Sequence, residues 1–499
     1  MHSRGIKIVL LLALVVRLSL LAAAWNNEGG VFTPDSKGYV QLARTLVDGR
    51  FVDDAGRPEI FRTPGYPLFM LVGVPAGPEL GWRVVLIVQV LIDVALVYLT
   101  YLLGSLLCGG RAGVLAAGLQ AISAVAVASS LRILSDGLFA FLLTLAVLLL
   151  VFHWRSGRRW AIIACAGSLV AATYVRPVGL VYVMLIGAFL AIAATSRLLR
   201  RRRASRTSNA ESRMPNPVSS LGLFAAICLA GLCPWVLRNA ATADYVGFSS
   251  FAADSVYFYA APEVLVRREG ISPEAARLRM HKLDEQDEAH HSKPRMPGQA
   301  VEFRERISRE IIGQDRGLYL RLHLRGVVGY FMPAANEVLE IAGLSSGQRG
   351  TSDILRQQGV WAAAKYYFGG NWQAMALAVP MVLILLVQYA GVLAWVVTRT
   401  IDRIRGRSRE AGHGVGEACL SASFEGDAPA MAANAAVVPP DVRSMTPVIV
   451  LLAVMVGVSS LLSGPFGLPR YRVPMMPIIN LAAAAGLMVL GGLLRTRRR

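Results

Sequence analysis

Apolar runs long enough to cross a bilayer recur along the chain, separated by polar segments. A membrane-spanning helix needs about 20 largely apolar residues, and the pattern predicts about ten such helices. Their expected ranges are 6–25, 82–107, 112–130, 134–154, 160–175, 178–195, 218–237, 374–398, 446–463 and 473–494. The pattern therefore predicts an all-α polytopic membrane protein.

The composition supports this class over a soluble one. Hydrophobic residues make up 55% of the 499 residues and charged residues 17%, and the mean hydropathy is +0.50. The net charge of +19 would suit nucleic acid, but the basic residues form short blocks beside apolar runs, as the positive-inside rule predicts. We therefore expect a membrane partner and no nucleic acid.

The basic blocks also predict the orientation of the chain. They lie at 4–7, 111, 155–159, 197–206, 399–409 and 495–499, all on one side of the predicted spans. This side is expected to be cytoplasmic, with both termini, in the cell inner (plasma) membrane. Small residues after the first apolar run also fit a cleaved signal peptide, but Arg17 inside that run favours a retained span.

Three parts follow from this topology. Residues 1–237 form an N-terminal membrane module with a first outer loop at 26–81, and residues 238–373 form a mostly helical segment on the outer face. Residues 374–499 form C-terminal spans around a loop at 406–443, rich in Ala, Gly, Ser and Pro and expected to be disordered. In the outer segment, Ser272 is a candidate helix cap, and the stretch at 327–331 is expected to rest on the bilayer interface.

Unusual polar residues near membrane depth gather on the outer side. They are Asp35, Lys37, Arg62, Asp136, Arg176, Arg238, Arg470 and Arg472. Ionisable groups are costly at this depth and often mark a functional site. A single arginine is more simply an interfacial anchor, whereas the whole set favours a shared anionic ligand.

Two carboxylates are candidates for catalysis. Asp35, in "TPDSKGYVQLARTL", is placed to act as a general base or to orient an acceptor; the alternative is a helix cap, supplied by Asp35 or Ser36. Asp136, in "RILSDGLFAFLL", either caps a span or faces the same cavity as a second carboxylate.

Two proline-rich segments carry arginines toward the membrane. Arg62 precedes "TPGYPLF", and Arg470 and Arg472 flank Tyr471 in "GLPRYRVPMMP". Guanidinium groups stay charged and bind phosphate in a bidentate manner. A phosphate-bearing lipid head group is therefore the expected ligand, with general anionic-lipid contact as the alternative.

Together these motifs resemble the GT-C membrane glycosyltransferases, in particular the group of protein O-mannosyltransferases and lipid A aminoarabinose transferase. The resemblance rests on "DSKGYVQLARTL", "RTPGYPLF", the acidic residue of the fourth span, "YVRPVGL", "CPWVLRNA" and "RYRVPMMP". It implies a GT-C-like fold, with Asp35 as the essential first-loop aspartate and Asp136 as the second acidic residue. Asp35 is followed by Ser36 where protein mannosyltransferases typically have an Asp-Glu pair, which argues against protein O-mannosylation.

The resemblance also implies a substrate and a set of binding residues. The expected function is transfer of a sugar from a polyprenyl-phosphate donor to a lipid, glycan or protein acceptor at the outer face. Expected substrate-binding residues are Lys37, Tyr39, Arg62, Tyr66, Arg176, Arg238, Arg470, Tyr471 and Arg472.

Other functions stay open. A polysaccharide ligase or polymerase would use outer arginines without needing Asp35, and a lipid or solute transporter would place polar residues at mid-membrane. No cofactor is expected, and a divalent metal, although possible, is not indicated, because His281, His290, His291 and His323 lack a ligand arrangement and the five cysteines lack metal-ligand spacing. Arg17 and Asp93 are expected to pair within the membrane.

Overall fold

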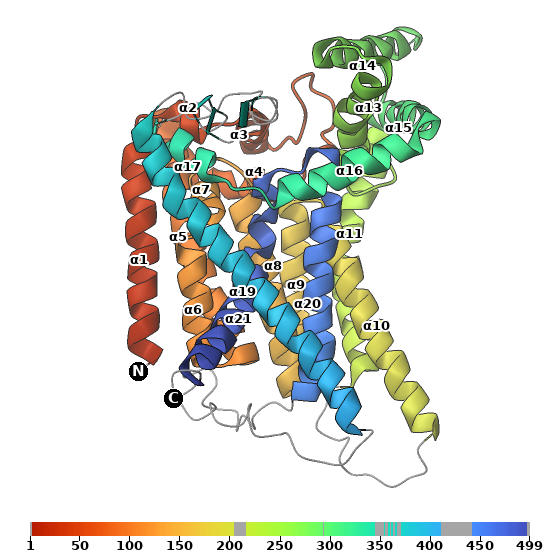
Figure 1. Ribbon diagram of the computed structural model, residues 1–499. Helices are drawn as coiled ribbons and strands as arrows, with labels where there is room; N and C mark the ends of the chain where they lie inside the picture. Colours follow the sequence, from red (N-terminus) through yellow and green to blue (C-terminus); the bar gives the residue numbers. More distant parts are fainter. Residues whose placement is uncertain are drawn as a thin grey trace.

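The computed structural model describes residues 2–203, 216–292, 294–344, 371–410 and 442–496. It also describes 354, 358–359, 361–362 and 365–366. The described chain is built from helices and contains no strand, only one isolated antiparallel bridge between Val52 and Pro58. Figure 1 shows a bundle of long helices with shorter helices gathered at one end. The predicted all-α membrane architecture is confirmed.

Eight helices of the described chain are long and apolar enough to cross a membrane. They are α1 (His2–Ala24), α5 (Gly77–Cys108), α8 (Asp136–Ser156), α10 (Gly179–Arg203), α11 (Pro217–Ala243), α19 (Trp372–Glu410), α20 (Val442–Leu462), and α21 (Met476–Thr496) continuing from the 3₁₀ helix η5 (Pro469–Met475). The predicted range 160–175 is the shorter apolar helix α9 (Arg159–Val175), of 17 residues.

The predicted range 112–130 is not one straight helix. It is divided into α6 (Gly110–Ala121) and α7 (Ala124–Ser130), which are bent by 61° relative to each other. A break inside a membrane frees backbone carbonyls that lipid cannot satisfy. Side chains of other helices take them up: Gln388 Nε2 donates to the Leu119 carbonyl at 3.4 Å and Arg17 Nη1 to the Ala121 carbonyl at 2.9 Å.

The predicted pair between Arg17 and Asp93 is confirmed. Arg17 Nε lies 2.5 Å from Asp93 Oδ2, and the two side chains are 0% and 1% exposed. Arg17 also donates to the Ala13 carbonyl at 3.0 Å. The guanidinium thus joins α1, α5 and the broken end of α6 inside the bundle.

One end of the bundle carries the short helices (Figure 1). The first loop forms α2 (Glu28–Val31), α3 (Pro34–Val47), α4 (Gly65–Met70) and the 3₁₀ helix η1 (Leu71–Ala76), and the outer segment adds α17 (Ala335–Ile341). At the opposite end α1 begins and α21 ends. Helix α19 continues to Glu410, so the start of the predicted 406–443 loop is helical, and 411–441 lies outside the described residues.

The outer segment has a small core of its own. It comprises α12 (Phe251–Ser255), the π-helical turn η3 (Val256–Ala260), α13 (Ala261–Glu269), α14 (Pro273–Ala289), α15 (Pro297–Gln314) and α16 (Arg316–Tyr330). Tyr257, Leu265 and Met280 are buried in this core. As predicted, Ser272 caps α14, accepting from the Ala275 amide at 3.1 Å.

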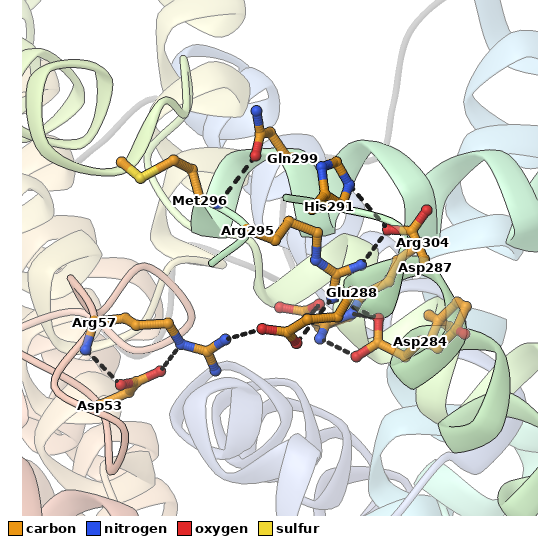
Figure 2. Close-up of polar contacts among 12 residues, drawn as sticks. Asp53, Arg57, Asp284, Asp287, Glu288, His291, Arg295, Met296, Gln299 and Arg304 are labelled. Atoms are coloured by element: carbon orange, nitrogen blue, oxygen red, sulfur yellow. Dashed lines mark hydrogen bonds and ion pairs between the residues drawn. The ribbon is translucent and has the colours of Figure 1, made fainter. Parts of the chain in front are cut away.

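An ion-pair network holds this segment together and attaches it to the first loop (Figure 2). Arg295 is buried and contacts Asp284 and Asp287 at 3.1 and 2.5 Å. From the first loop, Arg57 Nη1 lies 3.7 Å from Glu288 Oε1. The first loop is therefore held between the membrane helices and the outer segment.

The buried Arg17–Asp93 pair generates a stability prediction. Arg17→Met leaves the Asp93 carboxylate without its counter-charge inside the bundle, and we expect a loss of about 3–5 kcal/mol. Thermal unfolding in detergent measures it. The double variant Arg17→Met/Asp93→Leu should recover most of this loss, and Arg4→Met, at an exposed position of α1, is the matched control. Equal melting of Arg17→Met and Arg4→Met would contradict the prediction.

Candidate active site

Helix α3 presents Asp35 at its first turn. The start of this helix is stabilised by Ser36, whose Oγ accepts from the Thr33 amide at 2.9 Å and donates to the Ile133 carbonyl at 2.8 Å. The N-cap of α3 is Thr33, and Ser36 lies three positions later as its capping-box partner, so neither Asp35 nor Ser36 is itself the N-cap. The Asp35 carboxylate, 43% exposed, pairs with Arg470 instead, at 2.8 Å from Nη2 to Oδ2.

A second arginine approaches the other oxygen of Asp35. Arg62 Nη2 lies 3.8 Å from Asp35 Oδ1, and its guanidinium stacks over the ring of Tyr39 at 5.2 Å. Gly38 makes this position accessible, because a Cβ there would lie 2.5 Å from Arg62 Nη1. The first loop and the late "PRYR" segment therefore meet at one carboxylate, although 435 residues separate Asp35 from Arg470.

The second predicted carboxylate lies beside the first. Asp136 begins α8, is almost fully buried, and forms an ion pair with Arg176, which follows α9. Tyr39 Oη and Ser135 Oγ are 3.0 Å apart and join α3 to the start of α8. The segment η5, which carries Arg470, packs against α8, which begins with Asp136. The two carboxylates thus belong to one cluster.

Positive side chains lie on several sides of the partly exposed carboxylate. Three guanidinium groups, those of Arg62, Arg176 and Arg470, surround the carboxylates of Asp35 and Asp136. An anion placed beside Arg62 and Arg470 would be attracted to their guanidinium groups.

Other predicted binding residues lie around this cluster without joining it. Tyr66 is fully buried, donates to Gln89 Oε1 at 2.5 Å and packs edge-on against the Tyr39 ring, so it supports Tyr39 from behind. Lys37 is exposed on α3. Tyr471 is half-buried, and the Arg470 guanidinium lies over its ring at 5.4 Å.

Two of the predicted substrate-binding arginines have structural contacts instead. Arg238 donates to the carbonyls of Glu59 at 2.7 Å and Phe51 at 2.9 Å, so it fastens the first loop to α11. Arg472 is buried and donates to the carbonyls of Tyr330 at 2.5 Å and Met332 at 3.2 Å. These contacts use their guanidinium groups inside the protein, and the structure does not bring either residue to Asp35.

The sequence analysis missed an ionic contact from the outer segment. Arg132 Nη2 lies 2.5 Å from Glu340 Oε2 and its Nη1 lies 3.7 Å from Glu337 Oε2, both on α17. Burial raises the pKa of Glu337, opposed by the Arg132 and Arg470 guanidinium groups. Asn27 adds bonds to the carbonyls of Glu340 and Ile341 at 2.9 and 3.0 Å. The only signals in the sequence were an arginine inside an apolar junction and two glutamates three positions apart.

The described residues contain no group of three or more His, Cys, Asp or Glu side chains placed to hold a metal ion. In the outer segment, the His281 ring packs against Phe258, and His291 lies 3.8 Å from Asp287.

Comparison with known proteins finds similarity at the level of structure. No family model matches the sequence, and no curated protein matches it. Among solved structures, the archaeal oligosaccharyltransferase AglB from Archaeoglobus fulgidus, in complex with an inhibitory peptide and a dolichol-phosphate, is similar with a TM-score of 0.49 and 14% identity over 99% of this chain and 51% of that chain. ArnT from Cupriavidus metallidurans bound to undecaprenyl phosphate is similar with a TM-score of 0.38 and 15% identity, over 78% and 79%.

The chain spans about half of the length of the archaeal oligosaccharyltransferase structures. At these TM-scores and identities, the assignment of function depends on the geometry of the site itself.

Arg132 should hold α17 against the membrane helices. In Arg132→Met, Glu337 and Glu340 lose their shared counter-charge, and amide hydrogen exchange across 335–341 should accelerate by roughly tenfold or more, since a hydrogen bond to a charged group contributes about 1.5–3 kcal/mol. Hydrogen exchange with mass spectrometry measures this. Arg83→Met, at the same end of the bundle and stacked on Trp25 and Trp82, is the control. Unchanged exchange in Arg132→Met would remove Arg132 from this role.

Proposed function

We propose that this protein is an integral membrane glycosyltransferase that moves a sugar from a polyprenyl-phosphate donor to an acceptor. The observation that carries the proposal is the Asp35 carboxylate, which is 43% exposed and held between Arg470 and Arg62. It lies at the end of the bundle that carries the short helices. A carboxylate for the acceptor and arginines for a phosphate are the two groups that such a transfer needs.

In this reaction the acceptor hydroxyl attacks the anomeric carbon of the sugar. The new bond forms as the bond from that carbon to the phosphate oxygen breaks, and polyprenyl phosphate leaves with the bonding electrons. Asp35 orients the acceptor and takes its proton. Attack opposite the leaving group inverts the anomeric configuration.

The arginines act on the leaving group. Negative charge develops on the phosphate as the bond breaks, and positive groups already in place stabilise it without reorganisation. Arg470 and Arg62 reach Asp35 from two sides, so a phosphate beside Asp35 would contact both. Asp136 holds Arg176 within the cluster, which supports a positioning role for this second carboxylate.

The position of the charged groups favours this function over transport. A transporter would place its substrate site near the bilayer midplane. Arg17 and Asp93, which pair within the spans, are buried and closed, whereas the partly exposed Asp35 carboxylate and its arginines lie at one end. A polysaccharide ligase or polymerase stays the alternative enzyme, and the dependence on Asp35 distinguishes it.

We place the site at the outer face of the cell inner membrane, with both termini cytoplasmic. The support is the positive-inside rule. Helix α8 carries Arg155 in its last turn, and α9 begins at Arg159 after Arg158. This junction lies at the end of the bundle opposite to α3 (Figure 1).

Asp35→Asn is the direct test of the carboxylate. Asparagine preserves size and helix start, because Ser36 stabilises the first turn, but it cannot accept the proton. We expect turnover to fall about 10²- to 10⁴-fold at unchanged expression. In a deletion strain, mass spectrometry of lipid extracts and glycans should show the donor accumulating and one glycan lost, both restored by the wild-type protein.

The matched control is Asp48→Asn, at the exposed other end of α3, which should restore the glycan fully. Restoration by Asp35→Asn at equal protein levels would show that Asp35 is not the catalytic carboxylate and would favour the ligase or polymerase alternative.

Arg470→Ala tests the phosphate side. Binding of undecaprenyl phosphate to the purified protein should weaken about tenfold or more, because a hydrogen bond to a charged group contributes about 1.5–3 kcal/mol. Arg470→Lys should recover part of the affinity, since a point charge lacks the bidentate fork. The variant Arg83→Ala removes another arginine at the same end of the bundle and should bind undecaprenyl phosphate normally. Wild-type affinity in Arg470→Ala would exclude it from the phosphate site.

A further inference from the structure

Helix α16 is fixed beside the end of a membrane-spanning helix. A Cβ at Gly326 would lie 1.8 Å from the Gly464 carbonyl oxygen, so the two backbones are in direct contact. His323 Nε2 lies 2.6 Å from the Leu461 carbonyl oxygen, and Tyr330 Oη lies 3.0 Å from Ser459 Oγ. Since Ser459 and Leu461 belong to the last turn of α20, α16 lies at the level where that span ends (Figure 1).

The opposite face of α16 is apolar and uncovered. Leu320, Leu324 and Val328 follow at intervals of four on α16, Met332 follows two positions after its end, and all four are 47–58% exposed. Residues four apart share one face of a helix, so these side chains form one continuous stripe. A stripe of this kind exposed to water would be costly.

Exposed apolar residues also gather where α20 ends. Leu461 and Leu462 are exposed at the end of α20, and Phe466 and Leu468 are exposed in the turn that follows. Exposed apolar residues of a membrane-spanning helix contact acyl chains. The contacts of α16 with this same turn therefore place its stripe beside the boundary between acyl chains and head groups.

Two basic residues border the stripe. Arg321 and Arg325 are exposed, each one position after a leucine of the stripe, and among the described residues neither has an ion-pair partner. An interfacial helix combines an apolar face in the boundary region with basic side chains directed at anionic head groups.

We propose that α16 is an interfacial helix, with its Leu320–Leu324–Val328–Met332 stripe in the bilayer boundary and Arg321 and Arg325 on anionic phospholipid head groups. This surface is distinct from the Asp35 cluster and does not depend on the reaction proposed for it. A lipid fits better than a second protein chain, because α16 lies at the level where α20 ends and carries exposed basic residues beside the stripe.

Photo-crosslinking tests the occupant of the stripe. The photoreactive residue p-benzoylphenylalanine is introduced as Leu324→p-benzoylphenylalanine in the full chain, reconstituted in vesicles of phosphatidylcholine and phosphatidylglycerol. Leu278 is the control, because it is a leucine of similar exposure, 55% against 53%, on α14, which lies farther from the bundle (Figure 1). Intact-protein mass spectrometry should find phospholipid adducts at 324 and far fewer at 278. Adducts with a second copy of the chain, or equal lipid adducts at both positions, would overturn the proposal.

The anionic head-group contact is tested in the same vesicles. Adducts at 324 should be enriched in phosphatidylglycerol over its share of the lipid. The variant Arg321→Gln/Arg325→Gln should lose this enrichment, by about fivefold for each arginine removed. Arg309→Gln, an exposed arginine of α15, should retain it. Enrichment that persists in the double variant, or is absent in the parent protein, would overturn the assignment of these arginines.

Discussion

A polar group inside a bilayer has no water to bind and must find its partner within the protein. This constraint organises the bundle. The break between α6 and α7 frees carbonyls, which accept hydrogen bonds from Arg17 and Gln388 on two other helices. Asn480 continues the chain of contacts by bonding both Gln388 and Gln120 at 2.8 Å. These hydrogen bonds connect four helices, α1, α6, α19 and α21.

The site lies where this constraint is relaxed. At the end of the bundle the carboxylates and guanidinium groups are again paired, but Asp35 stays partly exposed, so its pairing is open to exchange with an incoming ligand. Asp136, nearly buried beside Arg176, is not open in the same way. The ion pairs within the bundle are therefore buried and support the fold, whereas the Asp35 pair at its end is partly exposed and accessible to a ligand.

The sequence predicted the helices and the gathering of charged candidate residues at one end of them, because hydropathy and charge blocks are local signals. It also predicted that Asp35, Asp136 and Arg470 belong together, through the resemblance of their motifs. It did not predict Arg132 with Glu337 and Glu340, because that contact joins a junction between spans to a helix about 200 residues later. Neither could it separate Arg238, which bonds backbone carbonyls of the first loop, from an arginine directed at a ligand, since both are conspicuous charges near the membrane.

Arg470 and Arg472 show why this separation needs the backbone. Two residues apart in one short motif, they appeared equivalent in the sequence. The segment folds as the 3₁₀ helix η5, in which about three residues complete a turn, so side chains two positions apart point in different directions. Arg470 reaches Asp35 at 2.8 Å, while Arg472 turns into the protein and bonds the carbonyls of Tyr330 and Met332. Those carbonyls lie at the end of α16 and just after it, so Arg472 fixes η5 against the outer segment. The fixed backbone of η5 in turn directs Arg470 toward the Asp35 carboxylate.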